Sequence, residues 1–75
     1  MKYSSLSHVK MKSSIIKAIC RDKLVALKDC TVFTRNSTIA FDVANQLLSV
    51  CYLLDDEDLI DVSVRDLYHI STKEI

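Results

Sequence analysis

The densest group of potential ligands in the sequence is a run of four acids, Asp55, Asp56, Glu57 and Asp58, within an otherwise apolar stretch. Carboxylates at this density could bind a divalent cation or a basic partner. A calcium loop, however, needs oxygen ligands at alternating positions, a glycine for its sharp turn and a distant bidentate glutamate. The chain has no glycine. The run is therefore interpreted as a solvated turn between two helices or as a surface for a basic partner, and no metal site is expected.

A second charged group lies in the N-terminal half. Its four basic residues would share one face of a helix if that helix began as early as Ser7 or His8: Lys10, Lys17, Arg21 and Lys28. Such a stripe could neutralise several phosphates, which is the main source of sequence-independent affinity for nucleic acids. It could equally be a solvated helix face. Because no helix-turn-helix pattern, RNA-binding aromatic motif or zinc-finger spacing accompanies it, nucleic-acid binding is the alternative function.

The cysteines Cys20, Cys30 and Cys51 and the histidines His8 and His69 lack the close paired spacing of structural zinc sites. Cys20 and Cys51 fall on apolar helix faces, where a free cysteine is usually a small core residue. An odd number of cysteines favours a reducing cytoplasm over a disulfide framework. Nucleophilic catalysis would also need an orienting group and an oxyanion site in a pocket, for which so small a core has little room. Neither an enzyme nor a cofactor is expected.

The spacing of the apolar residues predicts a mostly α domain whose three helices cover about 13–28, 38–54 and 64–71. Lys23 interrupts the apolar face of the first helix, although its stem can extend to water. Ser63 is the expected N-cap of the last helix.

The region between the first two helices is ambiguous. Residues 30–34, with the sequence CTVFT, are β-branched and aromatic and predict a short β segment. The alternative is an α+β fold with a hairpin at 30–43, because Ile39, Phe41 and Val43 continue the alternation. The helical spacing that places Leu47 and Cys51 in the core argues against the hairpin.

A second apolar stripe on the middle helix contains Phe41, Leu48 and Tyr52. A helix that is apolar over more than one face is expected to be central or shared with a partner. A chain of 75 residues is also near the size at which a single domain is marginally stable. The sequence therefore predicts a small non-enzymatic regulator or inhibitor that binds another protein and forms a homo-oligomer, using this stripe and the acidic run.

The charge is unevenly distributed although its net value is zero: eight of the ten Lys and Arg residues lie at or before Arg35, and eight of the ten acids follow it. The two halves can therefore attract one another within a monomer or between copies. No charge-free run approaches the roughly 20 residues that span a bilayer. Lysines also interrupt any apolar core of a signal peptide. We expect one cytoplasmic domain over 1–75, outside membranes, with a flexible N-terminal arm at 1–7.

Overall fold

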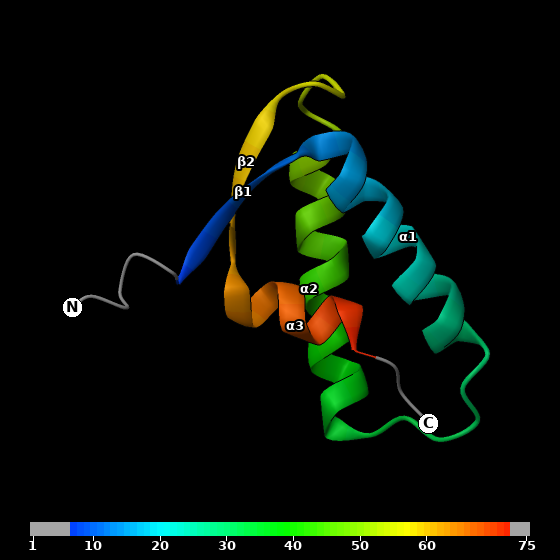
Figure 1. The fold of residues 1–75 in the computed structure, drawn as a ribbon. Coiled ribbons are helices and arrows are strands. Elements are labelled where there is room, and N and C mark those ends of the chain that lie inside the picture. Colours follow the sequence, from blue (N-terminus) through cyan, green and yellow to red (C-terminus); the bar gives the residue numbers. More distant parts are fainter. Residues whose placement is uncertain (1–6, 73–75) are drawn as a thin grey trace.

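The structure, a computed structural model, describes residues 7–72 (Figure 1). In chain order its elements are strand β1 (His8–Lys12), helix α1 (Ser13–Lys28), helix α2 (Arg35–Cys51), strand β2 (Leu59–Ser63) and helix α3 (Val64–Ser71). The protein is a small, mostly α domain with three helices and a two-stranded antiparallel sheet. The predicted fold class is confirmed.

The bounds of α1 and α3 agree with the prediction. The Ser63 hydroxyl caps α3 as expected, because it accepts a hydrogen bond from the backbone N–H of Arg65 at 3.2 Å. In contrast, α2 begins at Arg35 instead of residue 38, because the Thr34 side chain accepts from the Ser37 N–H at 3.1 Å and caps the helix earlier. The same helix ends at Cys51 instead of residue 54.

The β structure does not lie where the sequence predicted it. Residues 30–34 form an irregular connection, and the alternative hairpin at 30–43 is wrong because α2 starts at Arg35. In the part of the chain that the structure describes, the sheet consists of β1 and β2, so this connection lies outside it. The two strands lie before α1, at His8–Lys12, and after α2, at Leu59–Ser63.

In this sheet β1 pairs with β2, so that His8 lies opposite Ser63 and Lys12 opposite Leu59. Val62 is buried. Met11 and Ile60, which lie opposite one another, pack against the same core. One face of the sheet therefore covers the helices, as alternation along a strand requires.

The core lies between the α1–α2 pair and a layer made by the sheet and α3, which crosses α2 in Figure 1. The Cα trace is 14 Å thick in its smallest dimension, which accommodates two layers, because packed helix axes lie about 8–10 Å apart. Cys51 is buried in the core as predicted, whereas Leu47 is partly buried against it. The buried cluster comprises Ile16, Cys20, Ala44, Leu48, Cys51, Val62 and Ile70.

Lys23 is buried on the inner side of α1, and its ammonium group donates a hydrogen bond to the carbonyl of Thr72, just after α3. The stem thus packs with the core while the charge lies at the carboxyl end of a helix, where the macrodipole favours a cation.

The arm predicted at 1–7 lies outside the described residues except for Ser7. The Ser7 carbonyl accepts a hydrogen bond from the Val64 N–H at 2.8 Å and so continues the ladder of the sheet. Across residues 7–72, every helix is too short or too polar to cross a bilayer.

Candidate functional site

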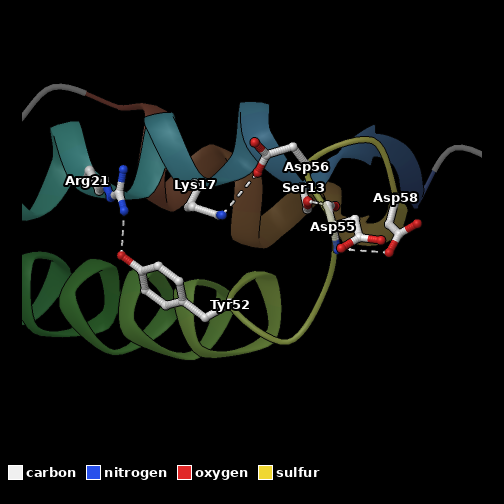
Figure 2. Close-up of polar contacts among 7 residues, drawn as sticks. All are labelled: Ser13, Lys17, Arg21, Tyr52, Asp55, Asp56 and Asp58. Carbon is white, nitrogen blue, oxygen red and sulfur yellow. Dashed lines mark hydrogen bonds and ion pairs between the residues drawn. The ribbon is translucent and has the colours of Figure 1, made fainter.

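The acidic run folds against the N-terminus of α1 (Figure 2). The backbone N–H of Ser13 donates to the Asp58 carbonyl at 2.8 Å, and the N–H of Ser14 donates to the Asp56 carbonyl at 3.3 Å. The Ser13 hydroxyl donates to the Asp55 carbonyl at 2.5 Å. The first N–H groups of a helix have no acceptor within the helix. Residues 55–58, the acidic turn, supply these acceptors and form a tertiary cap.

The turn is also closed on itself. The Asp58 N–H donates to the Asp55 carbonyl, and the Asp55 N–H donates to the Asp58 Oδ2, each at 3.0 Å. One carboxylate oxygen of Asp58 is therefore used for local structure. The acids also lie near the positive end of the α1 macrodipole, which favours negative charge.

Two ion pairs join the acidic turn to the basic half of the chain. Lys17 Nζ lies 3.2 Å from Asp56 Oδ1, and Lys12 Nζ lies 3.0 Å from Glu57 Oε1. The turn and the Glu57 pair are exposed, and exposed pairs contribute about 0–1 kcal/mol each. Some of the basic residues of the N-terminal half are thus paired with acids of the C-terminal half within one chain.

Tyr52 joins α2 to α1 beside this turn. Its hydroxyl accepts a hydrogen bond from an Arg21 guanidinium nitrogen at 2.6 Å. Lys17 Nζ lies 5.2 Å and Arg21 Cζ 5.5 Å from the centroid of the ring, within cation–π range. Figure 2 shows this cluster on the side of the α1–α2 pair opposite α3.

The four basic residues do not form one helical stripe. Lys10 lies on β1 opposite Asp61, because the chain is a strand where the prediction required a helix. Lys17 and Arg21 belong to the tyrosine cluster. Lys28 is exposed at the end of α1.

The structure divides the predicted apolar stripe of α2. Leu48 is 9% exposed and belongs to the core, whereas Phe41 and Tyr52 are 45% and 58% exposed. Around the helix, Leu48 lies between Phe41 and Ala44, at the border of the exposed and buried sides, and its side chain packs into the core.

Sequence reasoning missed Phe33, which is 52% exposed. Its ring packs edge to face with that of Phe41, with centroids 6.2 Å apart. Tyr52 directly follows α2 and lies 11 residues after Phe41, which places the two on nearly the same side of the helix and about 16 Å apart along it. Phe33, Phe41 and Tyr52 are called the aromatic surface below. The signal that could have identified Phe33 is a large aromatic residue in the connection between two predicted helices.

The buried thiols are poorly suited to nucleophilic chemistry. Burial, with a smaller effect from the neighbouring Cys51, raises the pKa of Cys20 to about 11. Burial also raises the pKa of Cys51, against an opposing effect of Lys17. Cys30 is partly exposed, and its thiol lies 3.5 Å from the Ala26 carbonyl. In the described part of the chain, no three His, Cys, Asp or Glu side chains are grouped to hold a metal ion.

Comparisons of the chain with protein-family models, curated proteins and solved structures each find no match.

Proposed function

We propose that the protein is a small non-enzymatic regulator or inhibitor that acts as a homo-oligomer and binds another protein through the aromatic surface. The observation that carries this proposal is the Phe33–Phe41 pair, in which two aromatic rings contact each other outside the core. Aromatic residues are enriched at the centres of protein interfaces and dominate their energetics.

The arrangement of the aromatic surface favours a protein partner over simple exposure. Phe41 is held on a helix, and Phe33 is positioned against it, so little side-chain entropy remains to be lost on binding. The Tyr52 ring is likewise fixed by its contacts with Arg21 and Lys17. A partner surface with an apolar centre to contact the aromatic rings and polar groups near the Tyr52 end would match the aromatic surface.

The acidic turn has a secondary role in the proposal. Its backbone is committed to α1, but the carboxylates of Asp56 and Glu57 remain exposed next to Tyr52 and the start of α1. Charges at the rim of an interface act mainly on the association rate. A partner with basic residues at its edge would therefore be attracted to this end of the aromatic surface.

A comparison of variants in affinity capture tests the proposal. The wild-type protein, Phe41→Ser and Tyr68→Ser are immobilised and exposed to native extract, and captured proteins are identified by mass spectrometry. Tyr68 is the matched control because it is an exposed aromatic residue on α3. We expect a stoichiometric partner that binds wild type and Tyr68→Ser but is lost with Phe41→Ser. The same captured set for all three proteins would refute the role of the aromatic surface.

Sedimentation velocity tests the homo-oligomer separately. We expect self-association of the purified wild-type protein at high micromolar concentration, and a strict monomer there would remove this part of the proposal. The assay needs no partner, so its outcome is independent of affinity capture.

Nucleic-acid binding is the alternative, supported by the two exposed cations Arg21 and Lys28 two turns apart on α1. It has less support because Arg21 already contacts Tyr52, and Lys10 lies on a different element. Binding to labelled single-stranded and double-stranded probes at low and moderate salt decides between the two. A steep loss of affinity with salt would favour nucleic acid.

A further inference from the structure

The outward side of α1 carries apolar residues and unpaired charges together. Val25 is 62% exposed, and Ala18, about two turns before it, is also exposed. Residues at this spacing lie on one side of a helix, here opposite the buried Ile16 and Leu27. This outward strip shares no residue with the aromatic surface, although Arg21 at its basic edge donates a hydrogen bond to Tyr52.

Charges of opposite sign border the two edges of the strip. At 100° per residue, Arg21 and Lys28 fall on one edge, whereas Asp22 and Asp29 fall on the other. Among residues 7–72, the side chains of Lys28, Asp22 and Asp29 make no ion pair. Arg21 donates one hydrogen bond to Tyr52 and keeps further N–H donors in its guanidinium group.

We propose that a second copy of this chain packs along the outward strip, with the two α1 helices parallel and related by a two-fold axis. In a parallel pair, the basic edge of each helix lies beside the acidic edge of the other. Arg21 is then level with the partner's Asp22, and Lys28 is level with the partner's Asp29. Ala18 and Val25 of one copy meet their equivalents at the centre.

The charges exclude the antiparallel arrangement. A two-fold axis perpendicular to the helices places the basic edge beside the partner's basic edge and the acidic edge beside the acidic edge. Juxtaposed like charges disfavour an interface. The strip is therefore self-complementary in the parallel orientation.

The inference deepens the self-association in the proposed function and assigns it to α1 in place of the Phe41–Tyr52 side of α2. One helix strip is small compared with the roughly 800 Å² per partner of a stable interface. The dimer is therefore weak and requires measurement at high micromolar concentration.

Charge reversal tests the ion pairs by sedimentation equilibrium. Asp22→Arg makes both edges basic at this level, and Arg21→Asp makes both acidic. We expect each variant alone to self-associate at least about tenfold more weakly than wild type, since like charges then meet. An equimolar mixture should recover association, because the two variants complement each other. No weakening in the single variants, or no recovery in the mixture, would overturn the proposal. Circular dichroism and urea melts establish that each variant is folded.

Cysteine cross-linking tests the orientation. In a Cys30→Ser background, Val25→Cys should form a disulfide-linked dimer under mild oxidation, because the two-fold axis brings residue 25 against its equivalent. In an antiparallel pair centred between Arg21 and Asp22, the two copies of residue 25 would be about 10 Å apart along the axis. Cross-linking only between Ala18→Cys and Val25→Cys chains would therefore refute the parallel pair.

Val25→Glu separates this inference from the proposed function. The variant should be monomeric and still bind the partner captured through the aromatic surface. If Val25→Glu self-associated as strongly as wild type, the α1 interface would be overturned, whereas the proposed role of the aromatic surface would be unaffected. Loss of partner capture in Phe41→Ser with an intact dimer would show that the two surfaces are independent.

Discussion

The connections on either side of α2 differ in which part of the chain contacts the rest of the protein. Residues 52–58 are strongly charged, but their backbone carbonyls cap α1 through Ser13 and Ser14. Residues 29–34 carry one charged residue, Asp29, and their two largest apolar side chains, Val32 and Phe33, are exposed. The backbone of this second connection contacts the adjacent helix ends. The Cys30 N–H donates to the Leu27 carbonyl at the end of α1, and the Thr34 carbonyl accepts from the Thr38 N–H at the start of α2.

The difference shows that side-chain chemistry alone does not identify a functional segment. The carboxylates of the acidic turn suggest a binding site. The groups that cap α1 are backbone carbonyls, however, and other side chains at these positions could leave the cap intact. The CTVFT segment predicted a short β segment, but in residues 7–72 it pairs with no strand. Both connections carry exposed apolar side chains, since Val32 and Phe33 in one and Tyr52 and Leu53 in the other are each more than half exposed.

The largest expected effect concerns two residues of α2 that the sequence placed in one stripe. Leu48→Ala should lower the free energy of unfolding by about 2–5 kcal/mol, because it leaves a cavity in the core. Phe41→Ala is the control on the same helix and should cost less than about 1.5 kcal/mol, near the value of an aromatic pair. Urea melts measure both. Equal losses would contradict the separation of core and surface along α2.

The thiols next to the two connections should differ in reactivity. Cys51 is buried with a raised pKa and precedes residues 52–58, whereas Cys30 is partly exposed in the other connection. Cys51 must be exposed by an opening of the structure before it reacts, so we expect it to react at least about 100-fold more slowly than Cys30. Reaction with a thiol reagent at pH 8, followed by peptide mass spectrometry, measures the ratio. Comparable rates would show that the end of α2 is open.

Loss of one hydroxyl should weaken the docking of the acidic turn. Ser13→Ala removes the buried donor to the Asp55 carbonyl and should cost about 1–2 kcal/mol in urea melts. Ser14→Ala is the matched control, because Ser14 contacts the turn through its backbone N–H, which the variant keeps. If Ser13→Ala were as stable as Ser14→Ala, the turn would not depend on this contact.

Neutralising the acids should have the smallest effect. The double variant Asp56→Asn, Glu57→Gln should change stability by less than about 1 kcal/mol, because the capping carbonyls remain and only exposed ion pairs are lost. Its stability should also depend less on salt than that of wild type. A loss of several kcal/mol would mean that the carboxylates themselves hold the turn.

The helices could be predicted because their signals are local. The apolar spacing and the Ser63 cap determined the bounds of α1 and α3, and Cys51 was correctly placed in the core. The start of α2 was wrong because Thr34, Ser37 and residue 38 all have side chains that can cap a helix. Only the three-dimensional path of the chain selects Thr34.

The sheet and the capping role of the acidic turn could not be predicted, since both depend on contacts between distant parts of the chain. The turn meets Ser13 across 42 residues, and β1 meets β2 across a similar distance. Alternation in five residues such as HVKMK is too short to distinguish a strand from the first turn of a helix. The residues of the proposed self-interface were visible in the sequence, but their exposure was not.

The distance in sequence between β1 and β2 has a consequence for the order of folding. Helices α1 and α2 are neighbours in the chain and can pack after closing a short loop, whereas pairing His8 with Ser63 requires the closure of almost the entire described chain. Because long loops close at a greater entropic cost and contacts between distant residues form slowly, we expect the helix pair to form early and the sheet late. During synthesis β1 therefore remains unpaired until β2 has been made. Lys10 and Lys12 should limit aggregation at this stage, since lysines on an unpaired strand disfavour its pairing with a strand of another chain.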